Sequence, residues 1–232
     1  MPKINTMINL SNIISQFLND LNNNLKLESL YQFEFNEELL PFAIHFPTTK
    51  YYDRNIILKQ ELHNAWAYAN VQTKGDIVEY YIKNWGGIRG NGITTMNQYR
   101  NQDTNQLLNR GYIGISSWSK ALVIHNPEEY FIYDSRVAFT INCLQEKYNL
   151  NNKIKFDIPS GRGRLVSIAS GLLNNQYNYN NWNYIIPLDE IYNNYLELIN
   201  LISNNTGFSK SKIEMSLFSI APSLASELIY NS

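Results

Sequence analysis

Lys120 and Asp134 are the residues of this chain whose types and positions suit one reaction together. We expect each to lie near the start of a helix, and the two helices follow one another along the chain. An unprotonated lysine amine can attack a sugar carbon, while a nearby carboxylate stabilises the positive charge that develops there. The pair therefore predicts covalent catalysis by an amine.

The surroundings of Lys120 suggest why its amine would be reactive. We expect the lysine in the first turn of a helix capped by Ser116 or Ser117, where the positive end of the helix dipole repels an ammonium group. Such locally unfavourable choices are most often found at functional sites. Burial against Trp118 and Tyr133 would add to the repulsion and expose the lone pair of the amine. The alternative is a lysine whose ammonium group simply reaches solvent.

Asp134 is expected to be the N-cap of a helix from Ser135 to about Lys147, because aspartate is among the best N-caps. A capping carboxylate is held rigid by backbone donors, and rigidity is also what a carboxylate facing a reacting sugar requires. A structural role and a catalytic role are therefore compatible at this residue.

Helical periodicity and helix-stop signals predict the elements that position these residues. No alternating strand series, internal repeat or linker is evident, so the sequence predicts an all-α fold. The segment 31–47 is rich in phenylalanine and contains two prolines, which leaves a short β hairpin or an irregular segment open. The expected helices span residues 8–21, 58–69, 77–85, 94–110, 135–147, 165–173 and 188–202, with a short helix ending before Pro127 and a last helix opened by a capping box at Ser211–Glu214.

Composition limits the classes of function. A net charge of −1 over 232 residues argues against non-specific coating of nucleic acid, although a local basic patch remains compatible with it. Cys143 is the only cysteine, which excludes clusters held by several cysteines and indicates a reducing compartment. His45, His63 and His125 lack ligand spacing, so we expect no metal site. With no secretory signal and no apolar run of about 20 residues, we expect a soluble cytoplasmic protein.

Three short motifs together resemble the helix-hairpin-helix DNA glycosylase superfamily, particularly its 8-oxoguanine glycosylase branch. They are Ser119-Lys120, Asn126-Pro127 and Ile132-Tyr-Asp-Ser-Arg-Val137, and the resemblance covers roughly residues 94–148. It implies a single domain over residues 1–232 with two helical lobes around a cleft. The hairpin and catalytic lobe would span about 78–150, and the flanking lobe 1–77 plus 151–232.

The resemblance also implies an activity. A base would flip out of the DNA, Lys120 would attack the anomeric carbon of its sugar, and a Schiff base would follow that can lead to strand cleavage. Asp134 would stabilise the transition state. The reaction needs no metal and no organic cofactor, and the partner would be DNA that carries a modified base. We expect a monomer, which would serve repair or defence against modified foreign DNA.

Two glycine-rich segments are candidate DNA contacts. Trp85 and Arg89 belong to a run of aromatic, glycine and cationic residues that suits a loop touching a flipped base or its phosphate, although helix termination also explains its glycines. Arg162 and Arg164 lie in Ser160-Gly-Arg-Gly-Arg164, which leads into a helix N-terminus and so suits a phosphate. Solubility is the competing explanation for these two arginines.

Four further residues complete the candidate site. Trp118 and Tyr133 flank the catalytic pair in sequence. Arg136 could meet the DNA backbone, with a structural ion pair as the alternative. Phe218 lies on the C-terminal helix, which walls the base pocket in the resembled family, and a place in the core is its alternative.

The leading hypothesis is therefore a DNA glycosylase with associated lyase activity. A second hypothesis is a catalytically silent DNA- or protein-binding module on the same scaffold, in which Lys120 would never form a Schiff base. A third is an all-α interaction protein with no nucleic-acid role.

Overall fold

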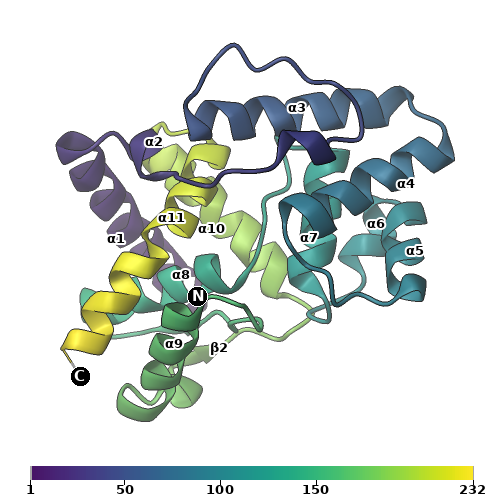
Figure 1. Ribbon diagram of the computed structural model, residues 1–232. Coiled ribbons are helices and arrows are strands. Elements are labelled where there is room, and N and C mark those ends of the chain that lie inside the picture. The colour runs from purple at the N-terminus through teal and green to yellow at the C-terminus, as the bar shows by residue number, and fades with distance from the viewer. Residues whose placement is uncertain (1, 232) are drawn as a thin grey trace. The chain divides into compact units, whose positions relative to one another are not determined.

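The computed structural model describes residues 2–231 and is mostly helical (Figure 1). The chain separates into two compact units. Residues 31–132 form one of them, here called the inserted unit, and residues up to 30 together with those from 133 onward form the other, here called the split unit. These ranges differ from the lobes expected from the sequence, 78–150 and 1–77 with 151–232.

The inserted unit is built around α7 (Ile115–His125), ten of whose eleven residues are buried. This helix is buried because the other helices of the unit contact it from several sides. They are α3 (Tyr51–Tyr68), α4 (Val71–Glu79), the π-helix η2 (Tyr80–Trp85), α5 (Ile93–Asn101) and α6 (Thr104–Leu108).

The split unit packs α11 (Lys210–Tyr230) against α8 (Ser135–Lys147) and α9 (Arg164–Gln176), while α1 (Pro2–Asn24) packs mainly on α10 (Ile191–Thr206). Two two-residue strands form a parallel pair in which Ile154 is opposite Tyr184. The remaining short elements are α2 (Leu27–Leu30), β1 (Ile154–Lys155), η3 (Tyr179–Asn181) and β2 (Tyr184–Ile185). The all-α prediction is therefore confirmed at the level of class.

The segment 31–47 contains no β hairpin and is irregular apart from a 3₁₀ turn, η1 (Glu37–Leu39). Side chains of α3 hold it in place: the Asn55 amide donates to the Phe33 carbonyl at 2.9 Å, and the Arg54 guanidinium lies over the Phe35 and Phe46 rings. Aromatic residues that suggested strands are thus anchored to a helix instead, and Pro41 lacks the backbone donor that a hairpin needs.

Several predicted helix boundaries differ from the structure, and two of the differences have a local cause in helix capping. The single helix expected over 94–110 is two helices, because Asp103 and Gln106 form a capping box that starts α6. The last helix begins earlier than expected, since the Ser209 hydroxyl accepts the Lys212 N–H at 3.2 Å, so Ser211–Glu214 is not a capping box. Over residues 2–231, no helix is both long enough and apolar enough to cross a membrane.

Candidate functional site

A glycine-bounded turn joins α6 to α7. Gly111 and Gly114 have positive φ angles of 63° and 73°, and Gly114 is the N-cap of α7 without any side-chain hydrogen bond. A Cβ at Gly114 would collide with the Tyr99 hydroxyl, so glycine is required there for two reasons. The predicted caps Ser116 and Ser117 instead lie inside the first turn. The segment is thus a helix, a tight turn and a second helix.

Lys120 is the sixth residue of α7 and therefore lies in its second turn, not in the first turn as predicted. The helix dipole acts mainly on the first turn, so the predicted repulsion of the ammonium group does not apply with its expected strength. The side chain is only 4% exposed, and its Nζ donates to the Ser116 carbonyl at 2.7 Å. Lys120 is consequently a buried lysine whose amine is held by its own helix.

The neighbouring aromatic residues are part of the core. Trp118 is fully buried. Trp85 ends η2, donates from its indole nitrogen to the Asn55 amide oxygen at 2.8 Å, and stacks on Tyr81 with ring centroids 4.3 Å apart. Arg89, by contrast, is exposed in the loop that follows Gly87. Of these residues, Arg89 has the exposure that a DNA contact needs.

Asp134 is the N-cap of α8, as predicted, and α8 spans the predicted residues. One carboxylate oxygen accepts the N–H groups of Arg136 at 3.0 Å and of Val137 at 3.1 Å. The preceding Tyr133 is buried and donates its hydroxyl to the Asp157 carbonyl at 2.7 Å. The carboxylate is therefore fixed in direction by two backbone donors, and the residue before it is anchored in the core.

A cluster of buried acidic and phenolic groups surrounds the start of α8. Glu214 of α11 is only 3% exposed, and Tyr195 of α10 is fully buried. Burial raises the pKa of Tyr195 well above its usual range, and the carboxylates of Glu214 and Asp134 raise it further. The sequence analysis assigned Glu214 to a capping box and did not predict its burial.

Arg136 and Phe218 contact each other within the split unit. The guanidinium carbon of Arg136 lies 4.5 Å from the Phe218 ring centroid, a cation–π arrangement. Arg136 forms no ion pair with an acidic residue in the described part of the chain, and Phe218 is partly exposed rather than part of the core. Both alternatives that the sequence left for these residues are therefore wrong.

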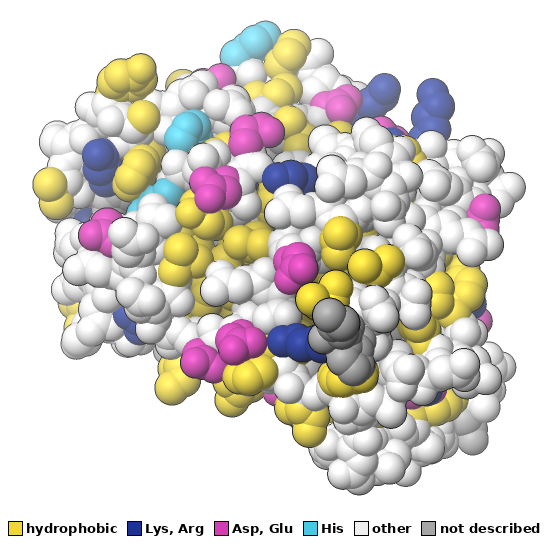
Figure 2. All heavy atoms as spheres, turned by 180° about the vertical axis from the view of Figure 1, so that it is seen from behind, with side chains coloured by type: hydrophobic (Ala, Val, Ile, Leu, Met, Phe, Trp, Pro, Cys, Tyr) yellow, Lys and Arg dark blue, Asp and Glu magenta, His cyan; other side chains and the backbone are white. Residues whose placement is uncertain are grey.

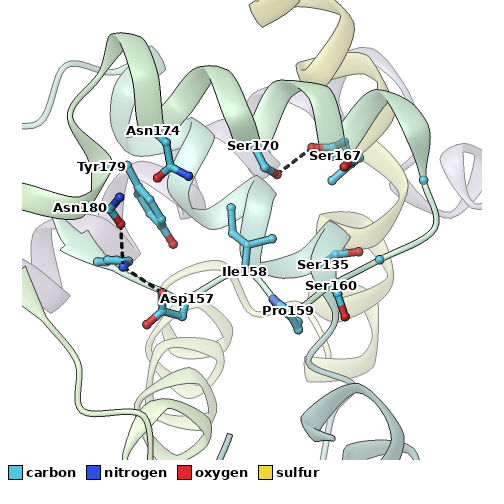
Figure 3. A pocket seen from close by; sticks show the side chains of 14 residues that line it. Ser135, Asp157, Ile158, Pro159, Ser160, Ser167, Ser170, Asn174, Tyr179 and Asn180 are labelled. Atoms are coloured by element: carbon cyan, nitrogen blue, oxygen red, sulfur yellow. Dashed lines mark hydrogen bonds and ion pairs between the residues drawn. The ribbon is translucent and has the colours of Figure 1, made fainter. Parts of the chain in front are cut away.

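A polar pocket of about 260 Å³ lies between α9 and the segment that follows β1 (Figure 3). Ser135 and Ser160 lie at one end of it, and Asp157 and Asn180 lie toward the other. The Lys155 ammonium lies 2.9 Å from the Asp157 carboxylate and 3.1 Å from the Asn180 amide oxygen. A Cβ at Gly161 would collide with the Ser135 hydroxyl, so glycine permits the close approach of these two segments. Sequence analysis did not predict this pocket.

Arg162 and Arg164 are exposed and alternate with the pocket glycines Gly161 and Gly163. Gly163 is the N-cap of α9 and provides no side-chain acceptor, while Arg164 is the first residue of that helix. The two arginines thus stand at an N-terminus whose backbone donors have no side-chain cap.

The charge distribution agrees with the small net charge. Figure 2 shows Lys and Arg side chains dispersed among acidic and uncharged groups over one face of the molecule. Among residues 2–231, no group of three or more His, Cys, Asp or Glu side chains is arranged to hold a metal ion.

The candidate residues fall into two sets. The inserted unit holds Lys120, Trp118, Trp85 and Arg89, and the split unit holds Asp134, Tyr133, Arg136, Arg162, Arg164 and Phe218.

Comparison of the chain with protein-family models, curated proteins and solved structures gives no match. The family resemblance therefore rests on the short sequence motifs alone.

Proposed function

We propose that the protein is a DNA glycosylase with associated lyase activity that acts on a modified base. The observation that carries the proposal is a succession along the chain: a short helix, a turn bounded by Gly111 and Gly114, a buried helix bearing Lys120, and then a capped carboxylate at Asp134. A glycine turn followed by a helix N-terminus presents backbone N–H groups to a phosphate, which suits a duplex-binding hairpin.

The chemistry divides between the two residues. The lone pair of the Lys120 amine forms a bond to the anomeric carbon while the glycosidic C–N bond breaks, and the electron pair of that bond leaves with the base. Loss of a proton from nitrogen and opening of the sugar ring give the Schiff base. Asp134 stabilises the positive charge on the sugar, a task for which its fixed orientation is favourable.

The exposed arginines provide the DNA contacts in this proposal. Arg162 and Arg164 meet phosphates at the start of α9, and Arg89 contacts the backbone from its loop. Arg136 and the partly exposed Phe218 ring form a wall for the flipped base. A net charge of −1 fits an enzyme that binds DNA through a local surface and not over its whole face.

A second candidate function is a catalytically silent binding module. The observation that favours it is the state of Lys120, whose side chain is 4% exposed and whose amine donates to Ser116. A lysine committed to its own helix can be structural, and the glycine turn would then serve binding alone.

Borohydride trapping separates the two functions. The protein is incubated with oligonucleotides that carry a panel of modified bases, reduced with borohydride, and examined for a covalent adduct. The enzyme forms an adduct that is absent in Lys120→Ala and present in Lys50→Ala, a control at an exposed lysine of the same unit. DNA binding without an adduct on any substrate would instead identify the silent module.

A further inference from the structure

Gly86 is a glycine for a reason that its backbone angles do not explain. Its φ of −76° and ψ of −10° suit any L-residue. A Cβ at this position, however, would lie 2.6 Å from Cε and 2.8 Å from Cδ of Lys120. Gly90 and Gly92, in the same loop, have no atom within 4 Å of such a Cβ. The side chain of Lys120 therefore occupies the space that any larger residue at position 86 would need.

The position of Gly86 is fixed by the π-helix that precedes it. The Gly86 N–H donates to the Tyr81 carbonyl at 3.0 Å, five residues back, and the Ile88 N–H donates to the Ile82 carbonyl at 3.0 Å. Trp85 is tied to α3 through Asn55. π-Helices are rare and often occur at functional sites. This one places Gly86, which has no side chain, against Lys120 of α7.

Lys120 is consequently held at two points. Its stem lies on Gly86, and its Nζ donates to the Ser116 carbonyl. A lysine side chain has four rotatable carbon–carbon bonds and would otherwise place its amine in many positions. Confining the stem fixes the nitrogen before any substrate binds, which reduces the entropy lost in reaching an attacking geometry.

We propose that Gly86 is a positioning residue for Lys120, and that the missing side chain at position 86 determines where the lysine amine lies. The effect on the reactivity of the amine rests on the proposed function. The packing of the Lys120 side chain against Gly86 does not. A residue larger than glycine at position 86 pushes the lysine stem away and moves the amine from its place.

A thermal double-mutant cycle tests the packing relation without any substrate. Gly86→Ala lowers the Tm of the full chain by roughly 4–8 °C, the range expected for overpacking in a domain of this size. In a Lys120→Ala background the same change lowers the Tm by less than half as much, the remainder arising from the Ile82 carbonyl, 2.9 Å from the new Cβ. Gly90→Ala, the matched control, leaves the Tm unchanged within error. Equal losses in both backgrounds would overturn the proposal.

A trapping experiment tests the consequence for the amine. On the substrate that the wild type traps, Gly86→Ala slows adduct formation at least tenfold and shifts the pH profile of trapping, while its DNA affinity stays unchanged. Gly171→Ala, at a glycine of α9 where an added Cβ meets no atom within 4 Å, leaves the trapping rate unchanged. An unaltered rate and pH profile in Gly86→Ala would overturn the positioning role. A wild type that forms no adduct would overturn the proposed function instead, and the thermal cycle would still decide whether Gly86 places the lysine side chain.

Discussion

The starts of α7 and α8 differ in how the backbone N–H groups of their first turns are capped. Each helix has backbone N–H groups in its first turn that lack a partner within the helix. At α8, the Asp134 side chain accepts two of them. At α7, Gly114 turns the chain through a left-handed conformation and offers no side-chain acceptor.

The difference has a chemical consequence. The donors of α8 already have a carboxylate, so that end of the helix holds a negative charge in a fixed place. At α7 the backbone itself accepts two of the first-turn donors: the Ile115 N–H donates to the Tyr112 carbonyl at 3.1 Å and the Ser117 N–H to the Gly114 carbonyl at 2.8 Å. One helix start therefore holds a fixed negative charge, and the other satisfies its donors mainly through the tight turn that precedes it.

The largest effect is expected for Asp134→Asn, a substitution that removes the charge of the side chain and keeps its ability to cap the helix. Asn caps a helix about as well as Asp, so Asp134→Asn should leave the Tm within about 2 °C of wild type. Loss of the negative charge should slow base excision by about 10²–10³-fold, as for removal of one group that stabilises a transition state. Single-turnover excision assays measure it. Undiminished excision in Asp134→Asn would reduce the residue to a helix cap.

The second effect concerns the far end of α7. His125 is buried, stacked on Trp66 and 3.2 Å from the Thr104 hydroxyl, and burial lowers its pKa to about 4. The unfolded chain binds this proton near pH 6.5, so stability should fall as the pH drops from 6.5 to 4, by about 3 kcal/mol. Below pH 4 this group adds no further loss.

Urea unfolding at pH 7 and pH 4.5 measures this contribution. The loss between the two pH values should be smaller in His125→Gln than in wild type, and unchanged in His45→Gln, a control at an exposed histidine. Identical pH dependence in wild type and His125→Gln would show that other groups cause the loss.

A third effect tests the glycine start of α7. Gly114→Ala should cost about 2–3 kcal/mol of unfolding free energy, because it combines backbone strain with a collision against the Tyr99 hydroxyl. Gly207→Ala should cost only about 1 kcal/mol, since its φ of 71° is similar but no atom lies within 4 Å. Tyr99→Phe should relieve part of the loss in Gly114→Ala and none in Gly207→Ala.

The smallest effect concerns the start of α11. Ser209→Ala should cost about 0.5–1 kcal/mol, because the hydroxyl caps the Lys212 N–H. Ser211→Ala should stay within about 0.5 kcal/mol of wild type, since Ser211 lies inside the first turn. Equal losses at both positions, measured by chemical unfolding, would contradict this boundary.

These helix starts also explain which parts of the structure could be predicted from the sequence. The N-cap at Asp134 and the bounds of α8 were predicted correctly, because a cap and its donors are two or three residues apart. The start of α7 was not, since Ser116 and Ser117 are as suitable locally as Gly114. The choice depends on Tyr99, which lies in another helix.

The same reasoning applies to the candidate site. Trp85 was predicted to be a platform in a loop, but Asn55 of α3 holds it in the core. Glu214 matches a local capping pattern, whereas its burial depends on packing around α10 and α11. Contacts between residues distant in sequence decided these cases, and a single sequence contains no direct signal of them.

The insertion of residues 31–132 separates α1 from its main packing partner during synthesis of the chain. The inserted unit is continuous and can fold as soon as it leaves the ribosome, whereas α1 packs mainly on α10, which begins at Ile191. At a translation rate of about 5–20 residues per second, α10 is synthesised roughly 10–30 s after α1. The buried residues Leu10, Ile14 and Leu18 of α1 therefore gain their main packing partner only late in synthesis.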